Sequence, residues 1–293
     1  NKEKTEVGHA LEVLAPQLWS IDNPYLYQVV NRLLQDDKVI DEEYISIGIR
    51  NIAFSAKNGF QLNGKSMKLK GGCIHHDNGL LGAKAFDRAE ERKIELLKAA
   101  GFNALRLSHN PPSTALLNAC DRLGMLVIDE AFDMWRYGHY QYDYAQHFDK
   151  LWKEDLHSMV ARDRNHPSVI MWSIGNEVDY PNDPYSHPIL DGSTINQPMF
   201  GGYKPDAPDA MRIGKIAKRL AACVRAVDTS RPVTGALAGV VMSNQTEYPE
   251  AIDVVGYNYT ENRYDEDHAT YPNRVIYGSE NGSGLEAWYA VQD

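Results

Sequence analysis

The sequence predicts an α/β fold: a (β/α)8 TIM barrel preceded by the trailing part of a β-sandwich. From about residue 66, short apolar strands alternate with amphipathic helices, which is the pattern of parallel β-α units. Polar residues follow many of these strands, as the top face of a barrel requires. No glycine-rich dinucleotide fingerprint is present, which disfavours an open doubly wound sheet.

Residues 1–65 are predicted to be the trailing part of the sandwich. Residues 26–33 and 44–50 alternate between apolar and polar side chains and are rich in strand formers. A third strand ends at Asn63-Gly64, a pair typical of tight hairpin turns. A closed sandwich needs about seven strands, so we expect its beginning to be missing.

Residues 66–293 are predicted to form the barrel. The predicted strands are residues 67–70, 104–107, 125–128, 169–174, 233–235, 252–256 and 275–278. The predicted helices are residues 87–100, 113–123, 148–164 and 210–227. Ser113 is expected to cap the second helix, and Gly101 and Gly124 to end the first two. Few residues follow Glu280, so we expect the eighth strand to be missing from the chain.

Composition narrows the classes of function. The net charge is −10 and no basic stripe is present, which argues against binding to nucleic acid or an anionic membrane surface. No apolar run is long enough to insert into a membrane. Cys73, Cys120 and Cys223 are widely spaced, so we expect buried free thiols. The 17 tyrosines and 5 tryptophans supply core packing and could also stack on sugars.

Two glutamates that end predicted strands carry the main functional signal. Alone, Glu177 or Glu280 would be most simply explained as a solvated carboxylate. Together, at the carboxyl ends of two parallel strands of one barrel, they can supply the proton donor and the nucleophile of glycoside hydrolysis. Asn176, which directly precedes Glu177, adds an amide at the same place.

Further polar residues are expected at the same mouth. Arg106 lies inside a buried strand and needs a partner, and a cation there would hold the nucleophilic carboxylate ionised. His109 follows that strand, where substrate contacts belong. Tyr257 and Tyr259 are candidates to hydrogen-bond the nucleophile. The long loop over residues 178–209 is expected to shape the substrate pocket.

The loop after the first predicted strand contains His75-His76-Asp77. Adjacent histidines suggest a metal, but neighbours in an extended stretch point to opposite sides, so no metal site is predicted. Asp77 could accept hydrogen bonds from sugar hydroxyls. After the third strand, Trp135 could form an aromatic wall, and Glu130 could be a second carboxylate or a structural ion-pair partner.

These stretches together resemble glycoside hydrolase family 2, which comprises β-galactosidases, β-glucuronidases and β-mannosidases. The matching stretches are His75-His76-Asp77, Arg106 with residues 108–111, and residues 120–124, 129–131, 162–177 and 278–280. The block 162–177 is the most specific. The resemblance covers residues 66–284 and implies that the preceding sandwich is immunoglobulin-like.

The resemblance also implies a retaining mechanism, with Glu177 as acid/base and Glu280 as nucleophile. It implies support of the nucleophile by Arg106, to which we add Tyr257 as a candidate. The sugar-binding residues expected from the resemblance and the sequence are Asp77, His109, Asn176, Tyr259 and Trp135.

Departures from the family pattern bear on metal and sugar. Metal-dependent β-galactosidases carry Glu-x-His after the strand-three acid, and residues 132–136 lack it. We therefore expect no metal and no cofactor. The segments that would distinguish a galactoside from a glucuronide are absent from this sequence. The motifs of this sequence most resemble those of bacterial β-galactosidases. We therefore expect a β-galactosidase, with a β-glucuronidase or another β-glycosidase of the family as the alternative.

A different class of function stays open, namely a carbohydrate-binding or inactive barrel derived from such an enzyme. An aldolase is disfavoured, since no predicted strand ends in a lysine suited to a Schiff base. The expected partner is a carbohydrate, and a homo-oligomer is compatible with the sequence. By analogy with bacterial enzymes acting on imported glycans, the location would be periplasmic or extracellular.

Overall fold

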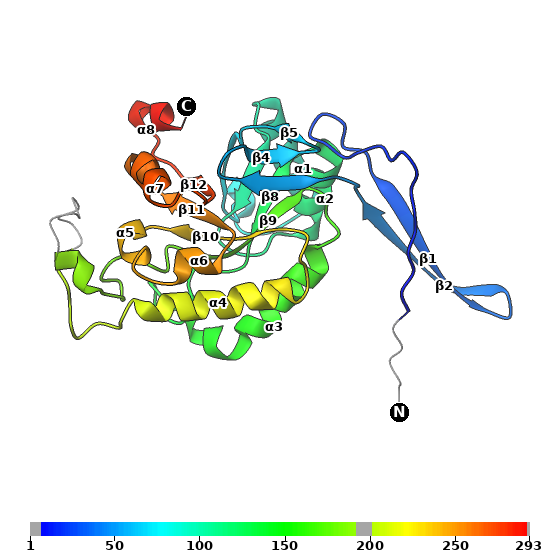
Figure 1. Ribbon diagram of the computed structural model, residues 1–293. Coiled ribbons are helices and arrows are strands. Elements are labelled where there is room, and N and C mark those ends of the chain that lie inside the picture. Colours follow the sequence, from blue (N-terminus) through cyan, green and yellow to red (C-terminus); the bar gives the residue numbers. More distant parts are fainter. Residues whose placement is uncertain (1–6, 192–200, 292–293) are drawn as a thin grey trace.

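A seven-stranded parallel sheet, rolled into a nearly closed barrel, forms the centre of the computed structural model, which describes residues 7–191 and 201–291 (Figure 1). Its strands are β6 (Gly71–Ile74), β7 (Ala104–Leu107), β8 (Leu126–Glu130), β9 (Val169–Asn176), β10 (Val233–Leu237), β11 (Val254–Asn258) and β12 (Ile276–Glu280). Each strand pairs with the next along the chain, which is TIM-barrel topology. The Cys73 Sγ lies 3.6 Å from the Ser279 carbonyl oxygen, which brings edge strands β6 and β12 together.

Helices connect the strands and cover the outside of the sheet. They are α1 (Asp87–Ala99), α2 (Thr114–Leu123), α3 (Ala145–Asp163), α4 (Met211–Arg225), α5 (Val240–Ser243), α6 (Tyr248–Ala251), α7 (Tyr264–Thr270) and α8 (Leu285–Ala290), with 3-10 turns η1 (Gly79–Leu81), η2 (Pro188–Asp191) and η4 (Glu261–Arg263). The described helices include none long and apolar enough to cross a membrane.

The first barrel strand is four residues further along than predicted. The prediction placed it at residues 67–70, whereas β6 is Gly71–Ile74. A glycine is required at the start of β6, because a Cβ on Gly71 would lie 2.3 Å from the Ala104 carbonyl oxygen. Close backbone approach between β6 and β7 explains a glycine inside a strand.

Antiparallel sheets precede the barrel. Strands β1 (Tyr27–Gln35) and β2 (Lys38–Ile47) form a two-stranded ribbon that extends away from the barrel (Figure 1). Strands β3 (Ile52–Ser55), β4 (Gly59–Leu62) and β5 (Lys65–Ser66) form a second sheet. The predicted hairpin turn is confirmed, since Asn63 and Gly64 between β4 and β5 have φ of 52° and 78°.

Two hydrophobic clusters hold these parts together. The larger one lies between the barrel sheet and its helices and includes Ile94, Leu117 and Val224. The smaller one joins Trp19 and Phe60 of the N-terminal region to side chains of the barrel strands. We call this smaller group the basal cluster; besides Trp19 and Phe60 it comprises Leu62, Ala104, Leu126, Ile128, Ile170, Met171 and Val254.

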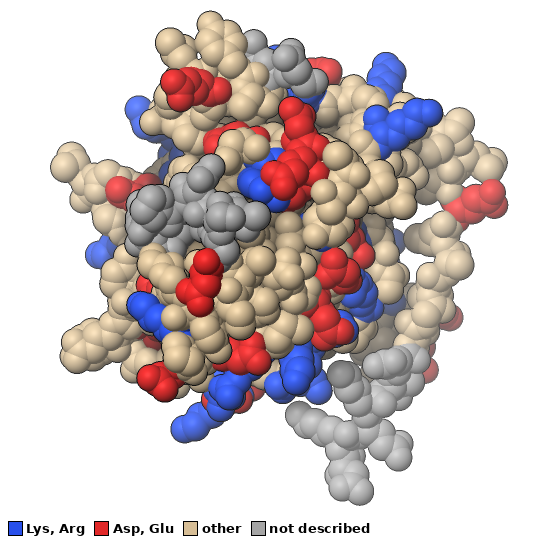
Figure 2. All heavy atoms as spheres, turned by 60° about the vertical axis from the view of Figure 1, so that its left-hand side comes forward, with Lys and Arg blue, Asp and Glu red and all other residues tan. Residues whose placement is uncertain are grey.

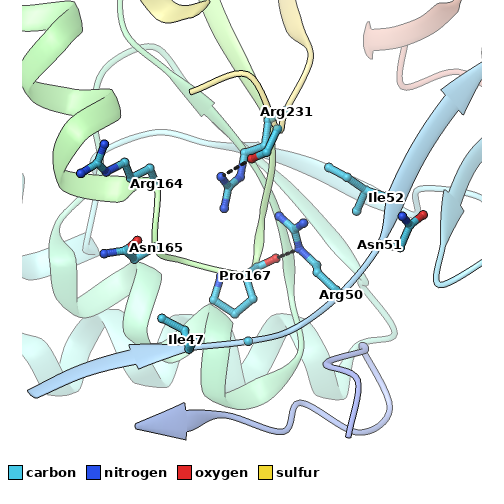
Figure 3. Close-up of a pocket in the computed structure, with 10 residues that line it drawn as sticks. Ile47, Arg50, Asn51, Ile52, Arg164, Asn165, Pro167 and Arg231 are labelled. Carbon is cyan, nitrogen blue, oxygen red and sulfur yellow. Dashed lines mark hydrogen bonds between the residues drawn. The ribbon is translucent and has the colours of Figure 1, made fainter. Parts of the chain in front are cut away.

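The segment before β3 is tied to the amino-terminal end of β9. Arg50 donates hydrogen bonds to the carbonyl oxygens of Pro167 and Val169. Arg50 and Arg231 both line a cavity of about 390 Å³. Figure 3 shows their guanidinium groups close to each other there. Burial, and then the charge of Arg231, lower the pKa of Arg50 to about 9. This cavity lies at the opposite ends of the strands from Glu177 and Glu280.

The three cysteines are free thiols. Cys120 and Cys223 are buried as expected, but Cys73 is only partly buried, because β6 is an edge strand of the sheet. On the face shown in Figure 2, basic side chains are interspersed with acidic ones rather than gathered in a stripe.

Candidate active site

Glu280 is the last residue of β12, and Glu177 follows the end of β9, so both lie at the carboxyl ends of barrel strands. A continuous chain of hydrogen bonds connects their side chains. It runs from Glu280 through Arg106 and Asn176 to Asn258, and from Asn258 to Glu177. The sequence-predicted pair is therefore brought to one mouth, where parallel-barrel active sites form.

Arg106 is the centre of this chain. Its side chain is 3% exposed, and it donates to three groups from different strands. Nη1 bonds Glu280 Oε1 at 2.8 Å, Nη2 bonds Asn176 Oδ1 at 2.9 Å, and both Nε and Nη2 bond Glu130. Burial opposes the charge, but Glu130 together with the other nearby groups, Glu280 among them, raises the pKa of Arg106. The buried strand arginine thus has its partners.

Glu130 is completely buried and serves as a counter-ion. Its oxygens accept from Arg106, from Ser173 Oγ at 2.6 Å, and from His109 Nδ1 at 2.7 Å. Burial alone would raise the pKa of Glu130, yet the Arg106 charge and the bonds from His109 and Ser173 together lower that pKa. Burial disfavours charge on His109, but the hydrogen bond to Glu130 and the Glu130 and Asp133 charges together raise the pKa of His109. Of the two readings for Glu130, the structure favours the ion-pair partner.

Glu280 receives donors on both oxygens. Arg106 bonds Oε1, and the Tyr259 hydroxyl donates to Oε2 at 2.6 Å. That bond raises the pKa of Tyr259, so the phenol stays protonated and continues to donate. A cation and a hydroxyl donor thus hold the two oxygens of this carboxylate in place, as suits a positioned nucleophile.

Glu177 has a different environment. Its Oε1 accepts from Asn258 Nδ2 at 2.9 Å, and no ion pair to its carboxylate occurs among the described residues. Sequence reasoning missed Asn258, although it selected both neighbouring tyrosines. The alternation along β11 carries the signal, because successive strand side chains point to opposite faces. Since Tyr257 points outward to α7, Asn258 points into the barrel mouth.

The backbone at two of these positions is unusual. Glu177 and Tyr259 have φ of 46° and 52°, in the left-handed region that residues other than glycine seldom adopt. Such strained residues cluster at functional sites, where the surrounding structure over-determines them. Here the Glu177 amide donates to the Ala236 carbonyl and the Tyr259 amide to the Glu280 carbonyl, at 2.8 Å each.

Two expected site residues, Trp135 and Tyr257, lie elsewhere. Trp135 is 2% exposed, donates its indole N–H to the Ile174 carbonyl and packs on Tyr248, so the structure places it in the core and not as a wall for a sugar. The Tyr257 hydroxyl donates to Asp267 at 2.6 Å rather than to Glu280, because its side chain points outward. Asp77 is exposed, and its carboxylate accepts from the Gly79 amide.

The two adjacent histidines diverge, as expected for neighbours in an extended stretch. His75 makes an edge contact with the His109 ring, whereas His76 lies 3.4 Å from the Asn110 carbonyl oxygen. In residues 7–191 and 201–291, no group of three or more His, Cys, Asp or Glu side chains could hold a metal ion. Of the loop expected to shape the pocket, residues 192–200 lie outside the described residues.

The site therefore combines two carboxylates in unlike surroundings. One is fixed beside a buried cation, and the other, within the part of the chain that the structure describes, is bonded only to a neutral amide. Pairs of carboxyl groups held in different environments are how enzymes assign acid and nucleophile roles. The partly exposed Tyr259, 57% accessible, leaves this mouth open to a ligand.

Comparisons with known proteins agree with this architecture. Residues 55–269 match the model for "Glycosyl hydrolases family 2, TIM barrel domain", and residues 1–50 match "Glycosyl hydrolases family 2". The beta-galactosidase BoGH2A of Bacteroides ovatus is 38% identical over 94% of the chain, which spans 33% of that relative. A putative beta-glucuronidase of Formosa agariphila is 42% identical over 57% of the chain, which spans 16% of that protein.

Solved structures show the same relationship. A glycosyl hydrolase family 2 member from Bacteroides cellulosilyticus is 69% identical, with a TM-score of 0.86, covering 100% of this chain and 34% of that one. The beta-glucuronidase of Bacteroides uniformis is 28% identical, with a TM-score of 0.74, covering 90% of this chain and 31% of that one. The chain thus spans about a third of the length of these two structures and of the Bacteroides ovatus relative, and the match covers less of the Formosa agariphila protein. Because the family model matches residues 55–269, which include most of the barrel, the chain belongs to glycosyl hydrolases family 2.

Proposed function

We propose that the protein carrying this chain is a retaining exo-β-glycosidase that removes a terminal β-linked sugar by double displacement. Glu280 is the nucleophile and Glu177 the acid/base in this proposal. The observation that carries it is the asymmetry of the pair: Arg106 and Tyr259 both bond Glu280, whereas Glu177 is bonded by the neutral Asn258.

The proposed reaction follows from these contacts. Glu177 protonates the glycosidic oxygen while the Glu280 carboxylate attacks the anomeric carbon, giving a covalent glycosyl-enzyme. Glu177 then deprotonates a water that hydrolyses this intermediate. In this proposal Asn176 binds the sugar 2-hydroxyl, His109 and Asp77 face the sugar, and residues 1–65 end an immunoglobulin-like domain.

A β-galactoside is the preferred substrate, supported by the name of the Bacteroides ovatus relative, which matches over most of the chain. A β-glucuronide is the second candidate, supported by the name of the Formosa agariphila relative. Aryl β-galactoside and aryl β-glucuronide, assayed separately on the full-length protein, distinguish the two candidates.

The role assignments are tested on whichever sugar is cleaved. Glu280→Gln should abolish turnover, because the amide cannot form the glycosyl-enzyme. Glu177→Ala should lower kcat by about 10²–10⁴-fold, the usual contribution of general acid–base catalysis, and azide should restore cleavage of a substrate with a good leaving group. As a matched control, exposed Glu154→Gln on α3 should retain full activity.

Persistent activity in Glu280→Gln would overturn the nucleophile assignment. A full-length protein that binds one of these sugars but cleaves neither would favour the carbohydrate-binding alternative. Equilibrium binding of the same two sugars, measured by calorimetry, separates that outcome from a protein that does not recognise them.

A further inference from the structure

We infer that Asn258 is a positioning residue that fixes which oxygen of Glu177 carries the catalytic proton. The inference rests on the proposed function, since it concerns the acid/base step. Asn258 ends β11, is 1% exposed, and contacts polar groups at the ends of β12 and β9.

The orientation of the Asn258 amide follows from the acceptors on one side, Glu177 Oε1 and Asn176 Oδ1, and the Ser279 hydroxyl on the other. The Ser279 hydroxyl donates to Asn258 Oδ1 at 2.6 Å, so the oxygen side of the amide faces β12. The nitrogen side then faces β9. An amide nitrogen has two hydrogens to donate, and here Nδ2 lies 2.9 Å from Glu177 Oε1 and 3.2 Å from Asn176 Oδ1.

This orientation distinguishes the two oxygens of Glu177. Because Oε1 accepts from Asn258, a proton on the Glu177 carboxyl belongs on Oε2. Among the described residues no hydrogen bond to Oε2 is present, so that oxygen is available to the glycosidic oxygen. Asn258 adds no charge, which lets Glu177 alternate between acid and base; an arginine there would hold it permanently ionised.

The same amide also couples the two catalytic strands. Ser279 directly precedes Glu280 on β12, while Asn176 directly precedes Glu177 on β9. One buried side chain therefore bridges the residues adjoining both carboxylates. Loss of this bridge should misplace the Glu177 proton while the Arg106 and Tyr259 bonds to Glu280 remain.

Leaving-group dependence tests this on the full-length protein, with the sugar that it hydrolyses. A 2,4-dinitrophenyl leaving group departs without protonation, whereas an alkyl leaving group requires it. For Asn258→Ala, kcat/KM on the alkyl glycoside should fall about 10–100-fold, as for a misplaced catalytic group. On the dinitrophenyl glycoside it should stay within about threefold, because glycosylation then needs no general acid.

Two further variants sharpen the test. Ser279→Ala removes only one of the groups that orient the amide, so its effect should have the same selectivity and be smaller. Thr260→Val is the matched control: Thr260 is 7% exposed, two residues after Asn258, and its hydroxyl has no hydrogen-bond partner among the described residues. Its ratio of the two kcat/KM values should equal that of the wild type.

An equal loss on both substrates, or no loss on either, would overturn the positioning role. Activity of Asn258→Ala on the dinitrophenyl glycoside shows that the variant is folded. A wild-type protein that hydrolyses neither β-galactosides nor β-glucuronides would overturn the proposed function and this inference with it. If the wild type is active but Asn258→Ala lowers kcat/KM equally on both substrates, this inference alone is overturned.

Discussion

A single guanidinium organises the polar interior of the mouth. Arg106 uses its planar fork to bond Glu130 from two nitrogens and still donates to Glu280 and Asn176. A lysine has one compact charge and cannot span these directions. The residue therefore neutralises Glu130 and at the same time holds the carboxylate at the end of β12.

Asp129, the neighbour of Glu130, has the opposite environment on the outer side of β8. It is 0% exposed, and neither of its carboxylate oxygens has a hydrogen-bond partner among the described residues. Burial raises the pKa of Asp129 well above its ordinary value, and the adjacent Asp163 carboxylate adds to the rise. Two such carboxyl groups can share a hydrogen bond only while one of them holds a proton.

Stability should therefore depend on pH through Asp129. Its pKa is about 3.9 in the unfolded chain and higher in the folded protein, so the stabilisation is complete below the unfolded value and is lost as pH rises through the folded one. Asp129→Asn keeps a donor for Asp163 without the titration. Urea unfolding at pH 5 and pH 9 should show the wild type losing stability relative to Asp129→Asn. A wild type that gains relative stability at pH 9 would contradict this.

At the scale of elements, the sequence predicts helix and strand boundaries well where neighbouring residues determine them. The cap and stop of α2 are confirmed: Ser113 Oγ accepts from the Leu116 amide, and Gly124 has φ of 73°. Prediction failed where a residue's role depends on distant parts of the chain. Gly71 begins a strand because β7 lies against it, and Trp135 is buried because its loop folds onto Tyr248.

The end of α2 gives a prediction for this scale. Gly124→Ala should destabilise more than Gly101→Ala, although both glycines have positive φ. Each substitution puts an L-residue in a left-handed conformation, at about 1–2 kcal/mol. At Gly101 a Cβ meets nothing within 4 Å, whereas at Gly124 it would lie 2.4 Å from the Ile21 carbonyl oxygen. The backbone shift needed there adds about 1–3 kcal/mol.

Scanning calorimetry of the two variants beside the wild type checks this. Gly101→Ala is the internal control for the cost of placing an L-residue in the left-handed conformation. Equal losses of Tm would show that the segment containing Ile21 moves freely against α2, contrary to the packing in which Lys98 Nζ bonds both the Ile21 and Gly124 carbonyl oxygens.

At the scale of the whole molecule, the two ends of the barrel have different tasks. The carboxyl ends of the strands gather Glu177, Glu280 and the polar residues that orient them. The amino-terminal ends are closed by the N-terminal region through the basal cluster and through Arg50. This separation is typical of barrels, in which one face carries chemistry and the other carries stability.

Trp19 should therefore behave as part of the barrel core although it lies in the N-terminal region. It is 0% exposed within the basal cluster, and its indole N–H donates to the Asp121 carbonyl at 2.8 Å. Trp19→Ala should cost about 3–5 kcal/mol through the cavity it leaves, or about 10 °C in the Tm of the barrel. Trp19→Phe keeps most of the ring and should lose less, chiefly the hydrogen bond.

Calorimetry on the same protein measures both variants against Leu96→Ala, which truncates an apolar side chain 52% exposed on α1. Leu96→Ala should change the Tm little, because an exposed side chain leaves no cavity when it is shortened. If Trp19→Ala shifted the barrel transition no more than Leu96→Ala does, the N-terminal region would fold independently of the barrel. A large shift in Trp19→Ala with a smaller one in Trp19→Phe follows only if this tryptophan closes the barrel's amino-terminal end.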